Sequence, residues 1–186
     1  KMKQNHLKPL PQTAILYGGL HYDISVPTMK EEAQKYNIGD WYVMRGNNVR
    51  GDSIFHELEN TQIEVEKIDS ILSSAQWEVT TRMKHEGTEE SFLSMHGNSP
   101  RYLQIATHGF YYTPDEAQKV NYLKGYSDAM QLSGLVLSGG NAAWKGEKLP
   151  QGILGGILTA ETISHLDLSK TEMAVLSACQ SGKGQA

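Results

Sequence analysis

Two short apolar segments of the chain each end in a chemically reactive residue. Residues 102–107 form a mostly apolar run that predicts a strand, and His108-Gly109 turns out of it. Residues 173–178 predict the last strand, with Cys179 at its C-terminal tip. Both strands therefore deliver a side chain capable of acid–base or nucleophilic chemistry to the same kind of position, the carboxyl end.

Other apolar segments predict three further strand-like pieces. Residues 14–17 open the first strand, which the glycine pair 18–19 closes. Residues 77–83 alternate apolar and polar side chains, and residues 135–137 form a short buried piece.

The clearest predicted helix begins at Thr61. Thr61-x-x-Glu64 has the spacing of a capping box, in which the threonine hydroxyl accepts a free backbone N–H and the glutamate reaches back. An apolar stripe then recurs at helical spacing and predicts a core-facing side, formed by Ile63, Ile68, Ile71 and Leu72.

Three shorter helices are predicted elsewhere. They cover residues 29–36, a segment beginning at 88–90 with Phe92 and Met95 facing inward, and residues 158–165 with Thr159 as N-cap. The alternation of strands and helices predicts an α/β domain whose parallel sheet carries helices on both faces.

The segments between these elements predict connections. Residues 1–13 form a linker or tail, and residues 37–52 a long loop that could contain a hairpin. The glycine pairs 139–140 and 155–156 fit no phosphate-binding pattern, so loop geometry explains them better.

Composition narrows the class of protein. The 186 residues are 39% hydrophobic with a mean hydropathy of −0.46, which predicts one soluble globular domain. A net charge of −4 gives no footprint for nucleic acid or an anionic membrane, and no apolar run approaches the roughly 18 residues of a membrane span. The single cysteine excludes an intrachain disulfide and is consistent with a reducing cytoplasm.

His108 and Cys179 together suggest a catalytic dyad if their strands are neighbours. A thiol beside a basic imidazole loses its proton more easily, and the thiolate is the nucleophile. The alternatives are a buried cysteine acting as a small hydrophobe and a structural loop histidine. A zinc site lacks ligand spacing, so no metal or cofactor is predicted. The remaining histidines are interpreted as surface residues; they are His6, His21, His56, His85, His96 and His165.

Several segments in a fixed order resemble a known family. Residues 105–109 (IATHG) and 175–182 (VLSACQSG) resemble the paired signatures of CHAT domains, which are caspase-like cysteine peptidases of the clan of caspases, separase and gingipains. Supporting similarity covers residues 16–18, 61–71, 133–141 and 152–168.

The resemblance implies a fold and a set of roles. The fold would be a caspase-like three-layer sandwich with a mostly parallel sheet. Cys179 would be the nucleophile, His108 the general acid/base, and the backbone N–H groups of Gly109 and Cys179 the oxyanion hole; no third catalytic residue is implied. The function implied is a cysteine endopeptidase, and the alternative is a catalytically inactive caspase-like protein-interaction module.

The chain departs from the caspase signature around its cysteine. Ser177 stands two places before Cys179, the glycine comes one place later, and the histidine lies 179 − 108 = 71 residues upstream. A caspase preference for aspartate at the cut is therefore not implied. Ser177 and Asp23 are candidate substrate-pocket residues, and Asp23 would favour a basic residue before the cut.

The resemblance also suggests partners. We interpret residues 14–186 as a CHAT domain that is incomplete at its C-terminus and corresponds to a large-subunit-like piece, because the family places further strands after the cysteine strand. The expected partners are a protein substrate, a C-terminal small-subunit-like segment that completes the sheet, and an N-terminal helical-repeat sensor, with no nucleic acid and no membrane. The setting implied is bacterial signalling or defence.

Overall fold

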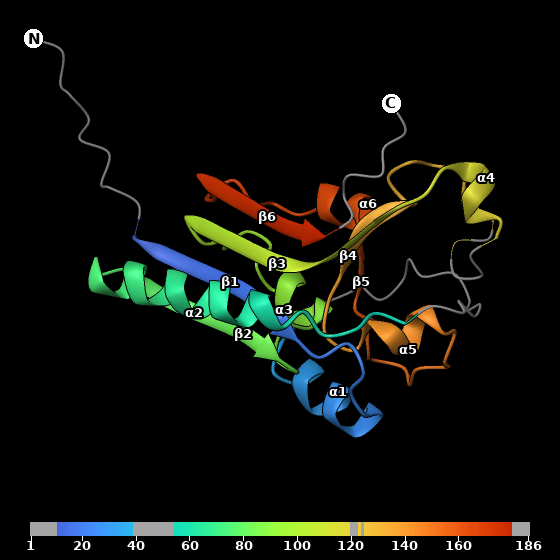
Figure 1. Ribbon diagram of the computed structural model, residues 1–186, viewed down its shortest axis with the longest axis horizontal. Helices are drawn as coiled ribbons and strands as arrows, with labels where there is room; N and C mark the ends of the chain where they lie inside the picture. The colour runs from blue at the N-terminus through green and yellow to red at the C-terminus, as the bar shows by residue number, and fades with distance from the viewer. Residues whose placement is uncertain (1–10, 39–53, 120–122, 124, 180–186) are drawn as a thin grey trace, which may run out of the picture.

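The computed structural model describes residues 11–38, 54–119, 123 and 125–179, and for Cys179 it describes the backbone alone. The fold is mixed α/β, with one sheet of six strands (Figure 1). The strands are β1 Thr13–Leu20, β2 Glu78–Lys84, β3 Tyr102–Tyr111, β4 Ser133–Val136, β5 Ile157–Thr159 and β6 Met173–Cys179. The described helices are α1 Val26–Ala33, α2 Glu59–Ser74, α3 Glu89–Leu93, α4 Pro114–Ala117, α5 Gly140–Trp144 and α6 Ala160–Ser164.

The sheet is organised around β3. The first part of β3 pairs in parallel with β1 and with β6, and β2 continues the parallel part beyond β1. The last part of β3, from His108 to Tyr111, pairs antiparallel with β4, which in turn pairs antiparallel with β5. The sheet is therefore mixed.

β3 is longer than the sequence predicted. The chain does not turn out of the strand at His108-Gly109 but continues to Tyr111. The additional residues carry backbone N–H and C=O groups that need partners, and β4 lies alongside to supply them. The antiparallel part of the sheet follows from this extension, which the expectation of a mostly parallel sheet did not include.

Alternate residues of β1 face two different cores. Ala14 and Leu16 pack with Val65 of α2, whereas Tyr17 packs with Phe92 of α3. Because neighbouring residues of a strand point to opposite faces, the two helices cover opposite sides of the sheet. Figure 1 shows α2 lying along the front of β1 and β2. The prediction of helices on both faces is confirmed for this part of the sheet.

The predicted capping box at Thr61 is wrong. α2 begins at Glu59 with Leu58 as N-cap, and no side chain caps it. The Thr61 hydroxyl instead donates to the Leu58 carbonyl at 2.6 Å and accepts the Gly19 N–H at 2.9 Å. Glu64 accepts a hydrogen bond from Gln104 in β3 at 2.6 Å. Both side chains of the apparent box therefore fasten α2 to the sheet.

The apolar stripe of α2 is only partly buried. Ile68 and Leu72 pack against the core, but Ile63 is 49% exposed and Ile71 66% exposed. The buried line follows Thr61, Val65, Ile68 and Leu72, at spacings of four, three and four residues. Ile63 and Ile71 fall off this line, so their assignment to the core was wrong.

Several other helices and strands begin or end at residues that differ from the predicted ones. β1 runs through the glycine pair to Leu20 with a register irregularity after Tyr17, and the first helix lies at Val26–Ala33 rather than at residues 29–36. Thr159 caps α6 as predicted, although Leu158 belongs to β5. The helix predicted to begin at residues 88–90 is α3, which starts at Glu89 with Thr88 as its N-cap. Most of the predicted tail and of the loop at residues 37–52, together with His6, lies outside the described residues.

No helix in the described part of the chain is long and apolar enough to cross a membrane.

Gly134 is predicted to tolerate no side chain. A Cβ there would collide with the Leu158 carbonyl oxygen and would lie 2.9 Å from both Phe110 Cζ and Thr159 Cα. Gly134→Ala should therefore cost about 1–3 kcal/mol of unfolding free energy and lower the Tm by several degrees in a thermal melt. Gly109→Ala is the matched control, since its Cβ would meet nothing closer than Ala178 Cβ at 3.4 Å. Equal losses in the two variants would contradict this account of β4.

Candidate active site

His108 and Cys179 are partners in the register of two adjacent parallel strands. The pairing of β3 with β6 runs from Tyr102 and Met173 to His108 and Cys179 without a shift. The expectation that the two strands are neighbours is confirmed. Because register partners in a parallel pair share a face, the two positions lie on the same side of the sheet.

The His108 ring is fixed by a backbone acceptor. Its Nε2 lies 2.7 Å from the His56 carbonyl oxygen. A carbonyl oxygen only accepts hydrogen bonds, so this contact places the proton of the neutral ring on Nε2. Nδ1 is then the basic nitrogen, which is the assignment a general base needs.

Aromatic rings pack around His108. The ring centroids of Tyr22 and Phe55 lie 5.0 Å and 5.3 Å from that of His108. Tyr22 is buried, and its hydroxyl shares a 2.9 Å hydrogen bond with Thr107, which itself donates to the Val136 carbonyl. These contacts restrict the imidazole to a narrow range of orientations.

Asn141 holds the segment that carries the His56 carbonyl. Its Oδ1 accepts the Phe55 N–H at 2.8 Å, and its Nδ2 donates to the Phe55 carbonyl at 2.9 Å and to Asp23 Oδ2 at 3.0 Å. Asn141 is fully buried in the first turn of α5, after Gly139 in the left-handed region at φ 81°. The glycine pair at 139–140 therefore serves loop geometry, as the sequence suggested.

Asp23 is held by internal partners. Its Oδ1 accepts from Lys145 Nζ at 2.9 Å and its Oδ2 accepts from Asn141. The hydrogen bond from Lys145 is the main cause that holds the pKa of Asp23 below its ordinary value, and the Asn141 amide adds to it. Its role as a substrate-pocket residue stays a prediction, and a basic substrate side chain would have to compete with Lys145.

The ion pair between Asp23 and Lys145 predicts a small loss of stability in acid. Because the folded-state pKa of Asp23 is lowered, its contribution is present above the unfolded pKa of about 3.9 and is lost as pH falls through the folded value. Lys145→Met should therefore be less stable than the wild type by under about 1 kcal/mol near neutral pH, and this gap should shrink toward about pH 3. Urea unfolding at the two pH values measures the gap. Lys148→Met, at an exposed lysine nearby, is the control, and a Lys145 gap that grows in acid would contradict the assignment.

Ser177 and Gly109 lie close to the predicted dyad. The Ser177 hydroxyl donates to Glu64 Oε2 at 3.1 Å, and the same carboxylate accepts from Gln104, so Ser177 ties β6 to α2. A Cβ on Gly109 would lie 3.4 Å from Ala178 Cβ, which puts Gly109 beside the residue before Cys179. The pocket role of Ser177 and the oxyanion-hole role of Gly109 and Cys179 stay predictions.

The sequence did not reveal the residues that support His108. A backbone carbonyl such as that of His56 leaves no mark in a sequence, and Asn141 is 86 residues from its partner Phe55. The one signal was a single polar residue, Asn141, directly before Ala-Ala-Trp. The His56 imidazole itself is exposed, as predicted, and the other described histidines are exposed or half-buried: His21, His85, His96 and His165.

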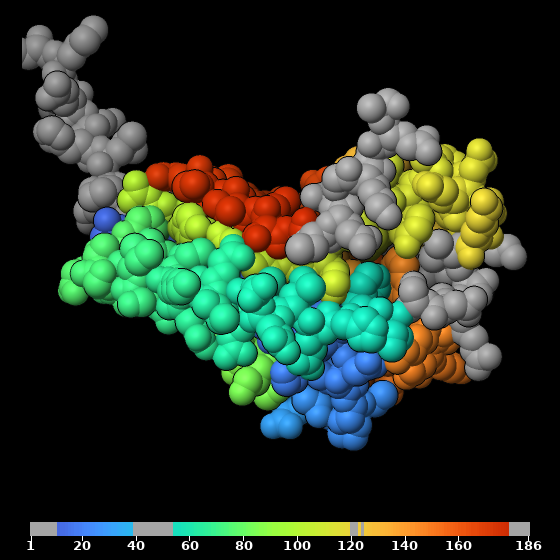
Figure 2. Space-filling model, in the orientation of Figure 1, coloured from blue at the N-terminus to red at the C-terminus, as the bar shows by residue number. Residues whose placement is uncertain are grey.

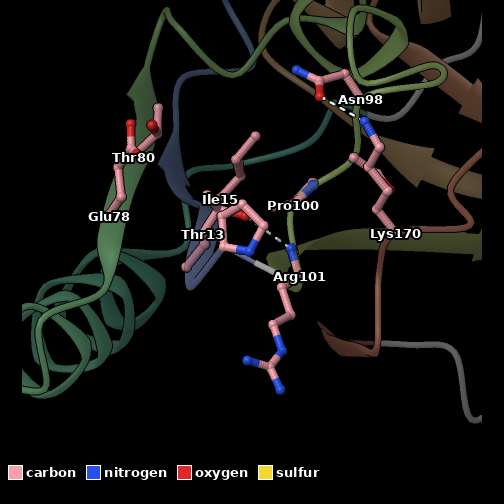
Figure 3. Close-up of a pocket in the computed structure, with 11 residues that line it drawn as sticks. Thr13, Ile15, Glu78, Thr80, Asn98, Pro100, Arg101 and Lys170 are labelled. Carbon is pink, nitrogen blue, oxygen red and sulfur yellow. Dashed lines mark hydrogen bonds between the residues drawn. The ribbon is translucent and has the colours of Figure 1, made fainter. Parts of the chain in front are cut away.

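A pocket of about 280 Å³ opens at the other end of the strands. Its walls include Thr13 and Glu78, the first residues of β1 and β2, and Arg101, which precedes β3 (Figure 3). Lys170 points away along the rim to Asn98, to which it donates at 3.0 Å. None of the predicted site residues lines this pocket, and the described residues contain no group of three or more His, Cys, Asp or Glu side chains that could hold a metal ion.

Comparison with known families decides the relationship of the chain. The family model of the CHAT domain matches residues 22–186. The chain belongs to the CHAT domain family. This is a caspase-like, peptidase-related family, and the matched region of this CHAT domain includes both His108 and Cys179. No curated protein and no solved structure matches the chain.

Proposed function

We propose that this CHAT domain is a cysteine endopeptidase in which Cys179 is the nucleophile and His108 the general acid/base. The observation that carries the proposal is the register pairing of His108 with Cys179, together with the contact that leaves Nδ1 of His108 basic. The family relationship supports the same reaction class, since the CHAT domain is related to cysteine peptidases.

The first half of the reaction is acylation. His108 Nδ1 accepts the proton of the Cys179 thiol, and the thiolate attacks the carbonyl carbon of the scissile peptide bond. The carbonyl oxygen becomes an oxyanion, which accepts hydrogen bonds from the N–H groups of Gly109 and Cys179. The imidazolium returns its proton to the leaving amine nitrogen as the C–N bond breaks, so the first product is an amine and the enzyme carries a thioester.

The second half is hydrolysis of the thioester. His108 Nδ1 takes a proton from water, and the resulting hydroxide equivalent attacks the thioester carbonyl. The C–S bond breaks, the sulfur recovers the proton from His108, and the acid product leaves. Throughout both halves the His56 carbonyl accepts from Nε2, which keeps the ring in one orientation with Nδ1 toward the reaction.

The finer features of the fold and its partners are part of the same proposal. β6 pairs with β3 alone among the described strands, and its Met173 and Leu176 side chains are 57% and 62% exposed. Figure 2 shows the surface of β6 along the upper rim of the molecule. An open edge of this kind favours a further strand beside β6, as a small-subunit-like segment of a caspase-like three-layer sandwich would supply. The proposed setting is the cytoplasm, with a protein substrate and an N-terminal helical-repeat sensor.

Labelling by a peptide electrophile tests the proposed function. A peptidyl chloromethyl ketone should alkylate Cys179 more than about tenfold faster than it alkylates free cysteine at the same pH, because the site would supply an ionised thiol and bind the peptide. The matched control moves the thiol within the strand, by combining Cys179→Ala with Ala174→Cys at an exposed position of β6. Equal rates for Cys179, the relocated thiol and free cysteine would favour the inactive interaction module instead.

A further inference from the structure

Asn141 connects three parts of the molecule around the predicted base. It lies on α5, its amide engages the backbone of Phe55, and it also contacts Asp23 in the connection between β1 and α1. The residue after Phe55 is His56, whose carbonyl is the acceptor for His108 Nε2. The buried amide of Asn141 therefore binds the residue next to His56, whose carbonyl sets the tautomer of His108.

The contact between Asn141 and Phe55 fixes a peptide plane. The Phe55 carbonyl and the His56 nitrogen share one planar peptide unit, so holding the Phe55 carbonyl at 2.9 Å also holds the start of His56. The position of the His56 carbonyl relative to that plane then depends only on two dihedral angles, φ and ψ of His56. The Phe55 ring adds a second restraint, since it packs 5.0 Å from Trp144 and 5.3 Å from His108, centroid to centroid.

The hydrogen bonds require an amide at position 141. Asn141 accepts one hydrogen bond, from the Phe55 N–H, and donates two, to the Phe55 carbonyl and to Asp23, which matches the acceptor oxygen and the two N–H donors of a side-chain amide. Asp23 locks the amide in this orientation, because its carboxylate can only accept from Nδ2. Lys145 holds Asp23 in turn, at 2.9 Å.

We propose that Asn141 is a positioning residue that holds the His56 carbonyl against His108 and so keeps His108 as the Nε2–H tautomer, with Nδ1 free. This inference rests on the proposed function only in treating His108 as the base. The tautomer itself is a property of the folded chain that is measurable without any substrate.

Nitrogen-15 NMR of the 186-residue chain tests the inference directly. Long-range proton–nitrogen correlations distinguish the two neutral tautomers of a histidine ring, and the His108 signals are assigned by their absence in His108→Gln. At about pH 8, where an unperturbed histidine is neutral, the wild type should show the Nε2–H form. Asn141→Ala should show a mixture of tautomers, and Asn98→Ala, the same substitution at an exposed asparagine that accepts from Lys170, should match the wild type.

A nearly isosteric variant guards against misfolding of Asn141→Ala. Asn141→Asp keeps the size of the side chain and the acceptor for the Phe55 N–H but cannot donate to the Phe55 carbonyl when ionised. It should lose the single tautomer as well. Retention of the Nε2–H form in a folded Asn141 variant, or its absence from the wild type, would overturn the inference.

Alkylation of Cys179 separates failure of this inference from failure of the proposed function. Iodoacetamide at about pH 7 should alkylate Cys179 at least about threefold more slowly in Asn141→Ala than in the wild type. In the double variant Asn141→Ala/His108→Ala, alkylation should be no slower than in His108→Ala alone, because Asn141 acts through His108. If His108→Ala leaves the alkylation rate of Cys179 unchanged, the proposed dyad is wrong, and the NMR experiment still tests the positioning role of Asn141. If His108→Ala slows the reaction and Asn141→Ala does not, the dyad stands and the positioning role of Asn141 is wrong.

Discussion

Cys179→Ala is expected to abolish peptide cleavage by this CHAT domain, with a residual rate at least about 10³-fold below that of the wild type. The reason is chemical: the chain has one cysteine, and no other side chain is proposed to form the covalent intermediate. Incubation with a proteome-derived peptide library, followed by mass spectrometry of the new N-termini, measures cleavage whichever peptide sequence the enzyme prefers.

The relocated thiol is the control for that experiment. Cys179→Ala combined with Ala174→Cys keeps one cysteine in β6 but puts it opposite Leu103 instead of His108. It should be as inactive as Cys179→Ala. Undiminished cleavage at the same sites in either variant would remove Cys179 from the mechanism.

His108→Ala is expected to slow cleavage by about 10²–10⁴-fold near neutral pH. In the proposed mechanism the imidazole takes the thiol proton at that pH and returns a proton to the leaving amine, and His108→Ala removes both steps. The same library assay measures the loss, with thermal melts to confirm that the variant is folded. His165→Ala is the matched control, since His165 is exposed at the end of α6 and hydrogen-bonds within that helix. A loss of less than about threefold in His108→Ala would exclude it as the acid/base.

Local sequence signals predicted those elements whose ends are decided locally. Thr159 accepts a backbone N–H at the start of α6, as predicted, and α3 starts within the predicted residues 88–90, because an N-cap involves residues only two or three positions apart. The last strand was predicted within one residue, since an apolar run between polar residues has few alternatives.

The predictions failed where distant residues compete for the same side chains. Thr61 and Glu64 have the spacing of a capping box, but Gly19 and Gln104 engage them instead. The length of β3 depends on β4, more than 20 residues later, which pairs with the last residues of the strand. No local pattern contains either partner, so neither result could be predicted from a window of sequence.

In the candidate site, too, the reactive residues were predictable from the sequence, whereas the residues that support them were not. His108 and Cys179 stand out in the sequence because each directly follows an apolar run, and the two strands that contain them are neighbours. The surrounding support does not stand out: one part is a backbone carbonyl, and the other is an asparagine that resembles part of a glycine-rich loop. Asp23 was predicted for its charge, but its hydrogen bonds turn it toward Lys145 and Asn141.

The most direct test of the dyad is the pH dependence of Cys179 alkylation in the wild type and in His108→Ala. Iodoacetamide rates are followed by intact mass between about pH 5 and 10, which reports the thiolate fraction of the only cysteine. The account predicts that the wild-type midpoint lies clearly below about 8.5, the value of a free thiol, and that His108→Ala returns the midpoint to about that value. Superimposable profiles for the two proteins would contradict the claim that His108 and Cys179 act as a pair.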